Sequence, residues 1–173
     1  MKLKTTALAL FFVLSAPLAQ ALEATPYVYR SVAEQPQNLQ DREIASLFDR
    51  WNSALQTGNP QAVVSLYAAN AVLQPTVSNQ VRSTHAQIQD YFEHFLATQP
   101  VGQINYREIR HLGPDAALDS GVYTFSLTAA DGQKQQVQAR YTFLYERIDG
   151  QWKILNHHSS AMPQVQPQLQ AAH

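Results

Sequence analysis

The spacing of the apolar residues changes once along this chain, near Pro100, and this change constrains the fold more than any other feature. Before Pro100, apolar residues recur at helical spacing, and the clearest run comprises Ile44, Leu47, Phe48, Trp51 and Leu55. After Pro100, they alternate with polar residues, as in half-buried strands. Helices followed by strands predict one α+β domain, in which a curved antiparallel sheet folds over the helices and leaves a cavity between them.

Three helices are predicted in the first half of the domain. The first begins at Asp41, whose carboxylate is suited to cap it, and ends at the break Thr57-Gly58-Asn59-Pro60. A second, short helix runs through 63–67. The third follows Thr84 as its cap and ends near Pro100.

Four strands, rich in β-branched and aromatic residues, are predicted in the second half. Asp131-Gly132 and Asp149-Gly150 favour tight hairpin turns and separate the last three strands, which makes the sheet an antiparallel meander. The four predicted strands cover 103–111, 115–128, 135–147 and 151–160.

The first 21 residues have the pattern of a cleavable secretory signal peptide. Lys2 and Lys4 precede an apolar run at 7–18, and Ala19-Gln20-Ala21 supplies the small residues of a cleavage site. A membrane-spanning helix needs about 20 apolar residues, so this run predicts no stable membrane anchor. We therefore expect a mature chain that begins at Leu22 and is secreted, into the periplasm.

The expected mature chain divides into three segments. Prolines and glutamines without sustained periodicity predict an N-terminal arm at 22–40, whose tyrosines are a candidate docking element for an envelope partner. The folded domain is expected at 41–163. The last segment, 164–173, is rich in Gln and Pro and is predicted to be a disordered tail.

Charge and cysteine content exclude several classes of function. The chain has 12 Lys+Arg and 13 Asp+Glu; without Lys2 and Lys4 the count is 10 against 13, a net charge of −3. The arginines are scattered singly and form no basic patch, so the sequence does not predict nucleic acid as a partner. The chain has no cysteine, which excludes disulfides, thiolate nucleophiles and thiolate metal sites.

The closing stretch, from Asp149-Gly150-Gln151-Trp152 to Ala161-Met162-Pro163, resembles the last strand of the nuclear transport factor 2-like superfamily. It is most similar to the association domain of calcium/calmodulin-dependent protein kinase II and to its small bacterial, SnoaL-like relatives. Three further blocks, 43–67, 90–96 and 112–117, resemble the opening helices, the third helix and an early turn of that family.

This resemblance implies a cone-shaped α+β fold, a pocket between sheet and helices, and self-association into a homodimer or higher oligomer through the outer surface of the sheet. It does not imply kinase activity, because the chain has no glycine-rich nucleotide loop, no His-Arg-Asp and no Asp-Phe-Gly. In that family, the association domain of the kinase lines its pocket with arginines on the middle strands. The nearest positions here are Phe125 and Phe143, with Arg140 nearby.

Alternation along the last strand places Trp152, Ile154, Asn156 and His158 on one face, which we take as the inward face. His158 would then reach the pocket as a general base, donor or ligand, or be held by core hydrogen bonds. His157 would lie at an oligomer interface or in solvent.

The other candidates each have a structural alternative. Arg140 is predicted either to meet an acidic ligand or to pair internally with Asp119 or Glu108. Arg82 is placed near the mouth of the cavity, where an exposed loop arginine is the default. For the remaining candidates, core packing competes with ligand contact: Tyr91, His94, Tyr123, Phe125, Tyr141 and Phe143.

Enzymatic and metal functions have weaker support. The six histidines lack metal-site spacing, so neither a metal nor another cofactor is predicted. The best catalytic candidates are Asp119, next to Tyr123, and His158, for an isomerase or cyclase of the SnoaL-like type. Our leading hypothesis is an exported, self-associating protein that binds a small molecule. An envelope interaction module is the third alternative.

Overall fold

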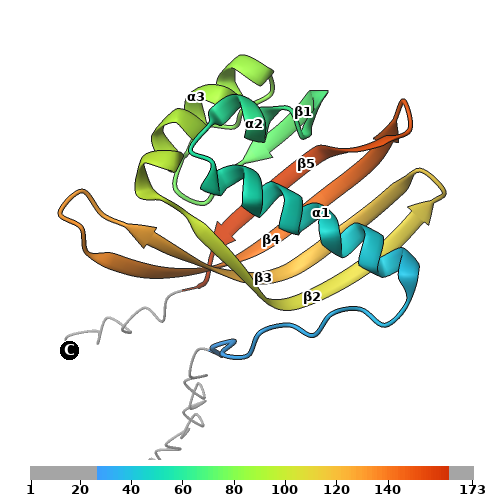
Figure 1. The fold of residues 1–173 in the computed structure, drawn as a ribbon, viewed down its shortest axis with the longest axis horizontal. Coiled ribbons are helices and arrows are strands. Elements are labelled where there is room, and N and C mark those ends of the chain that lie inside the picture. Colours follow the sequence, from blue (N-terminus) through green and yellow to red (C-terminus); the bar gives the residue numbers. More distant parts are fainter. Residues whose placement is uncertain (1–26, 164–173) are drawn as a thin grey trace, which may run out of the picture.

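A computed structural model describes residues 27–163, so the predicted signal peptide and tail lie outside the described residues. The structure confirms the α+β prediction: helices cover one face of a curved five-stranded sheet, in the order β1-β5-β4-β3-β2 (Figure 1). The elements are α1 (Leu39–Gln56), α2 (Pro60–Val64), β1 (Tyr67–Gln74), α3 (His85–Phe95), a 3₁₀ turn (Leu96–Thr98), β2 (Val101–Gly113), β3 (Ala116–Thr128), β4 (Lys134–Ile148) and β5 (Gln151–Ala161).

Helix α1 packs its apolar stripe against the sheet as predicted, but it begins earlier. Asn38 is the N-cap, because its Oδ1 accepts the backbone N–H of Asp41 at 2.8 Å. Asp41 lies in the first turn, where its carboxylate accepts hydrogen bonds from Asn38 Nδ2 and His111 Nε2. The prediction that Asp41 caps the helix is therefore wrong, because the N-cap lies one turn earlier. The buried stripe consists of Ile44, Ala45, Leu47, Phe48, Trp51 and Leu55.

Strand β1 is the element that the sequence pattern missed. Helix α2 ends at Val64, and the backbone from Tyr67 is a strand that pairs in parallel with β5, so the predicted helix at 63–67 is wrong at its end. The register shifts between Tyr67 and Val72, and the irregular strand shows no clean alternation. Strands β2 to β5 form the predicted antiparallel meander.

A bulge in β5 reverses the predicted orientation of its second half. Tyr145 pairs with Ile154 but Leu144 pairs with Asn156, so Leu155 is an extra residue in β5. One extra residue moves every later side chain to the opposite face. Trp152 and Ile154 therefore point inward as predicted, whereas the inward orientation predicted for Asn156 and His158 is wrong.

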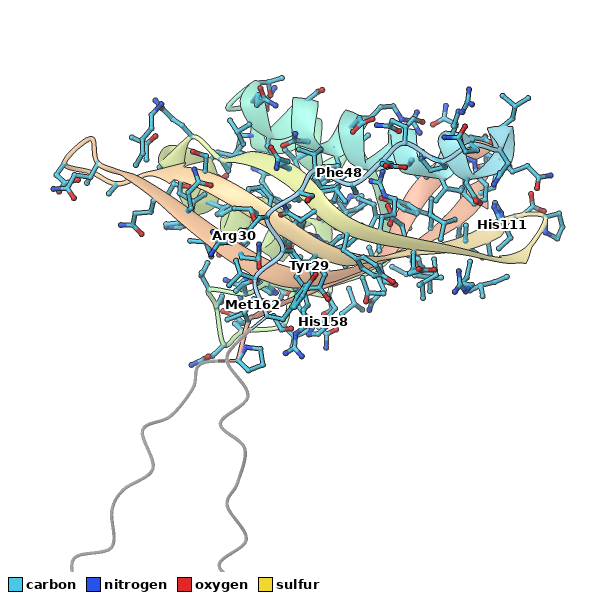
Figure 2. All side chains as sticks on the ribbon, turned by 90° about the horizontal axis from the view of Figure 1, so that it is seen from below. Tyr29, Arg30, Phe48, His111, His158 and Met162 are labelled. Carbon is cyan, nitrogen blue, oxygen red and sulfur yellow. The ribbon has the colours of Figure 1, made fainter. Side chains whose placement is uncertain are left out.

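The described part of the N-terminal arm lies against the outer face of the sheet (Figure 2). The backbone N–H of Tyr29 donates to Gln138 Oε1 at 3.2 Å, and Gln138 Nε2 donates to the Tyr29 carbonyl at 2.8 Å. Gln138 neighbours Ala139, which is buried on the inner face, so its own side chain belongs to the outer face. Tyr29 is thus held on this chain's own sheet, while Tyr27 is 74% exposed.

Candidate ligand pocket

A pocket lies between the helices and the inner face of the sheet, with about 470 Å³ of empty space including its open mouth. Its walls come from both helices α1 and α3, from four strands and from the segment that follows β1. Most of the wall is apolar: Trp51, Leu73, Pro75, Val77, Tyr91, Phe92, Phe95, Phe125, Leu127, Val137 and Ala139. Four polar side chains interrupt it: Thr76, Tyr123, His157 and Ser159.

Three hydroxyl groups of the pocket wall bond to one another. The Tyr123 hydroxyl donates to Ser159 Oγ at 2.5 Å, and Ser159 Oγ is also hydrogen-bonded to Thr76 Oγ1. Burial raises the pKa of Tyr123, so its hydroxyl stays protonated. The cluster is therefore neutral, and it joins β3, β5 and the segment after β1.

A second chain of hydrogen bonds runs from Trp51 through Tyr67 to His157. Trp51 Nε1 donates to Tyr67 Oη at 3.2 Å, and Tyr67 Oη lies 2.9 Å from His157 Nδ1. Burial lowers the pKa of His157 to about 3, so its imidazole is neutral. The ring stacks on Phe143, with 4.0 Å between the ring centroids.

This pattern assigns the tautomer of His157. The Tyr67 oxygen already accepts the Trp51 N–H, and its own hydroxyl proton needs an acceptor, which His157 Nδ1 provides. The proton of the neutral imidazole is then on Nε2. That nitrogen is buried and has no hydrogen-bond partner within the described part of the chain.

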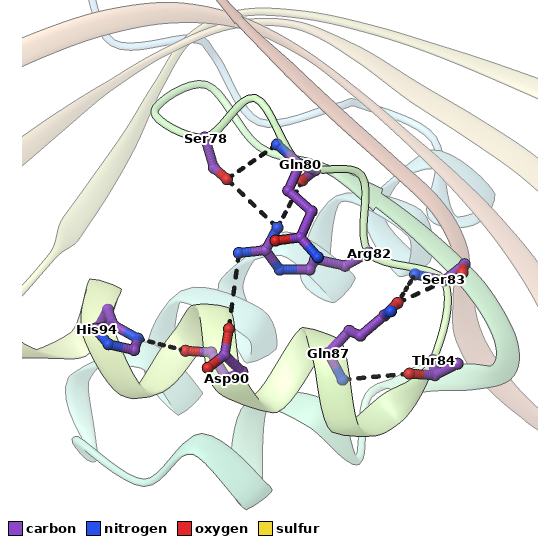
Figure 3. A network of polar contacts seen from close by, with 8 residues as sticks. All are labelled: Ser78, Gln80, Arg82, Ser83, Thr84, Gln87, Asp90 and His94. Carbon is purple, nitrogen blue, oxygen red and sulfur yellow. Dashed lines mark hydrogen bonds and ion pairs between the residues drawn. The ribbon is translucent and has the colours of Figure 1, made fainter.

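Arg82 lies beside the pocket in a network of polar contacts between the segment after β1 and helix α3 (Figure 3). Its Nη1 donates to the Gln80 carbonyl at 2.9 Å, and its Nη2 lies 3.7 Å from Asp90 Oδ2. The guanidinium also lies over the Tyr91 ring, 5.9 Å from its centroid. The side chain is only 9% exposed, so the default of an exposed loop arginine is wrong. Arg82, Tyr91 and the exposed His94 line an outer hollow that shares Tyr91 with the pocket.

A buried ion pair occupies a different part of the inner sheet face. Arg107 Nε lies 3.2 Å from each carboxylate oxygen of Asp119, and the Tyr141 hydroxyl donates to Asp119 Oδ1 at 2.9 Å. Burial raises the pKa of Asp119 to about 6, although Arg107 and Tyr141 oppose this shift. Asp119 is not among the residues that line the pocket. The stacked rings of Tyr123 and Tyr141 connect the two regions, with their centroids 5.0 Å apart.

The structure thus brings some predicted site residues together and separates others. Tyr91, Tyr123 and Phe125 line the pocket, and Phe143 lies behind His157. The predicted pairing of Arg140 with Asp119 or Glu108 is wrong, because these carboxylates pair with Arg107 and Arg110. Arg140 is exposed between the buried Ala139 and Tyr141, and its Nη2 donates to the Ala161 carbonyl.

His158 is likewise exposed on the outer face, where its side chain is labelled in Figure 2. Its predicted place in the pocket is taken by its neighbour His157, which is 4% exposed. The sequence reasoning missed three polar residues of the inner sheet face, Arg107, His157 and Ser159, and Thr76 in the segment after β1. A strict alternation with the opposite phase would have found His157 and Ser159, but no pattern in the sequence marks the bulge.

Among residues 27–163, no group of three or more metal-ligating side chains is found. Within the same residues, no helix has the length and apolar character needed to cross a membrane.

The fold and the pocket define a protein of the nuclear transport factor 2-like class. A Salmonella enterica protein of that superfamily has a TM-score of 0.63 at 16% identity, over 76% of this chain and 96% of the other. A protein from Novosphingobium aromaticivorans, described as a scytalone dehydratase, has a TM-score of 0.64 at 12% identity, over 74% and 90% of the two chains. At these identities the likeness shows the fold alone.

Residues 40–163 match the family model of the calcium/calmodulin dependent protein kinase II association domain. A Xanthomonas campestris structure described by the same family is 57% identical, with a TM-score of 0.79, over 80% of this chain and 99% of the other. The chain belongs to the calcium/calmodulin-dependent protein kinase II association domain family. Comparison with curated proteins gives no match.

Proposed function

We propose that this chain is an exported, self-associating protein that binds a small molecule in the pocket and has no kinase activity. The observation that carries the binding proposal is the pocket itself. It is open at its mouth, its walls are mostly aromatic and aliphatic, and a few polar atoms are held in fixed positions. This combination is typical of small-molecule sites.

Binding is tested by native mass spectrometry of the protein purified from its natural compartment. We expect a bound small molecule that is released on unfolding. Val137→Phe would fill the pocket and abolish retention of that molecule. Gln136→Phe adds the same ring at the adjacent, exposed position and should retain it. A wild-type protein without any bound molecule, or equal retention in both variants, would contradict the proposal.

Self-association is proposed to use the outer face of the sheet, beside the arm. There Ser120, Thr142 and His158 form one row across three strands, and Leu118 and Leu144 begin the next row. Small polar and aliphatic side chains suit a flat contact between two copies. Light scattering should give at least a dimer at micromolar concentration, and Thr142→Arg should shift it to the monomer. A wild-type protein that is strictly monomeric would refute self-association.

Export is tested by expressing the full chain and sequencing the N-terminus of the mature protein. We expect recovery from the periplasm with Leu22 as the first residue. Recovery of an uncleaved chain from the cytoplasm would overturn this part of the proposal.

The structure does not favour an isomerase or cyclase, because the two catalytic candidates, Asp119 and His158, lie apart from each other. His158 lies on the outer face, and Asp119 is engaged by Arg107 and Tyr141 away from the pocket.

A further inference from the structure

His157 presents a buried hydrogen-bond donor that the protein itself does not satisfy. Its Nδ1 lies 2.9 Å from the Tyr67 hydroxyl, and the opposite edge of the ring carries Nε2; His157 is one of the residues that line the pocket. Within the described residues, Nε2 has no hydrogen-bond partner. A buried N–H without an acceptor costs free energy, and an oxygen atom of a ligand would recover that cost.

The surrounding wall limits which acceptor can fit. The other polar groups of the wall are the hydroxyls of Thr76, Tyr123 and Ser159, which bond to one another and carry no charge. Among residues 27–163, no lysine, arginine, aspartate or glutamate lines the pocket. A charged ligand group would lose its hydration there without gaining an opposite charge. Trp51, Phe92 and Phe125 offer ring faces and edges for an apolar body.

We propose that the pocket selects an uncharged, apolar, ring-sized molecule carrying one acceptor oxygen, such as a carbonyl, which accepts the Nε2–H of His157. This inference rests on the proposed small-molecule function and assigns its ligand class. Tyr67 is a positioning residue, because its hydroxyl keeps the imidazole proton on Nε2. The low pKa of His157 supports the assignment, since an imidazole that stays neutral keeps one fixed donor.

The test uses three probes of nearly equal shape: indane, 1-indanone and indane-1-carboxylate. Their affinities are measured by calorimetry on the purified chain. We expect 1-indanone to bind roughly tenfold more tightly than indane, because only the ketone satisfies the buried donor. In His157→Phe this preference should fall to about onefold. His158→Phe makes the same change at the exposed neighbour and should keep the tenfold preference.

Several results would overturn the inference. Equal affinity of the wild type for indane and 1-indanone would do so while leaving the proposed binding function intact. Tighter binding of the carboxylate, lost in Arg82→Gln, would assign the ligand to the charged mouth instead. Failure of all three probes refutes the ligand class if native mass spectrometry finds another bound molecule, and refutes both proposals if it finds none.

A second measurement does not depend on the folding of His157→Phe. The ¹⁵N chemical shifts of the histidine side chains in the wild type report which ring nitrogen carries the proton. We expect His157 to be the Nε2–H tautomer, and Tyr67→Phe to weaken that preference. A proton on Nδ1 in the wild type would overturn the inference directly.

Discussion

The inner face of the sheet carries two buried polar regions, in which the free-energy cost of burying polar groups is compensated differently. Around Asp119, Arg107 supplies an opposite charge and Tyr141 donates a hydrogen bond, although Arg107 Nη2 and Asp119 Oδ2 have no hydrogen-bond partner among the described residues. At His157, burial keeps the ring neutral, Nε2 has no hydrogen-bond partner among the residues that the structure describes, and the residue lines an open pocket. The comparison teaches that the buried carboxylate is compensated by an opposite charge within the fold, whereas the neutral imidazole that lines the pocket is the group beside which a ligand can bind.

The largest expected effect is the pH dependence of stability that comes from His157. Burial lowers the pKa of His157 from 6.5 to about 3, so its contribution is fully present above pH 6.5 and is lost as the pH falls towards 3. At 1.36 kcal/mol per unit, this loss amounts to about 5 kcal/mol. His157→Gln should therefore lose much less stability than the wild type on acidification. Urea denaturation of both proteins at a series of pH values measures this difference in stability.

His158→Gln should be measured beside it, because the exposed His158 also contributes to lowering the pKa of His157. Parallel profiles of the wild type and His157→Gln between pH 6.5 and 3 would contradict the neutral, buried imidazole.

Removal of one partner of the ion pair is the next largest expected effect. Arg107→Leu leaves Asp119 buried without its cation, which should lower the free energy of unfolding at pH 7 by about 3–5 kcal/mol. Replacing both residues, in Arg107→Leu with Asp119→Leu, should cost less than the single change, because no uncompensated charge then remains. Chemical denaturation of the single and double variants tests this. A double variant less stable than Arg107→Leu would contradict the ion-pair description.

Asp119 has the opposite sign of pH dependence. Burial raises its pKa from 3.8 to about 6, so it binds a proton more readily in the folded state, and its contribution is present below pH 4 and lost as the pH rises through 6. The expected size is about 3 kcal/mol. Between pH 6 and 4 it offsets the loss from His157. Asp119→Asn should remove this compensation, so that stability falls from pH 6.5 downward, as pH-dependent denaturation would show. An unchanged plateau in Asp119→Asn would refute the raised pKa.

The sequence predicted the fold better than the site, for reasons that particular residues show. The helical spacing of Ile44 to Leu55 and the two Asp-Gly turns are local signals, and they define α1 and the meander. The resemblance of the closing stretch identified the family, which the match over 40–163 confirms. Strand β1 was not predicted, because its parallel pairing with β5 is a long-range contact that leaves no local signal in the sequence.

The site could be predicted only in part, because orientation within β5 depends on one bulged residue. Strict alternation placed His158 inward, and the extra Leu155 places His157 there instead. Arg107 was missed for a related reason. Its partner Asp119 lies on the neighbouring strand, so the ion pair follows from the register of β2 and β3 rather than from the sequence around either residue.

The smallest expected effects come from the two stacked tyrosines that connect the regions. Tyr141→Phe removes a hydrogen bond to a buried carboxylate and should cost about 2 kcal/mol, because bonds to charged groups are the stronger ones. Tyr123→Phe makes the same change in the neutral cluster, where Ser159 still has Thr76 as a partner, and should cost about 1 kcal/mol. Both rings keep their packing, so the difference isolates the charge of the acceptor. Thermal and urea denaturation at pH 7 measure the pair, and a larger loss in Tyr123→Phe would show that the pocket hydroxyls, rather than the ion pair, hold the sheet face together.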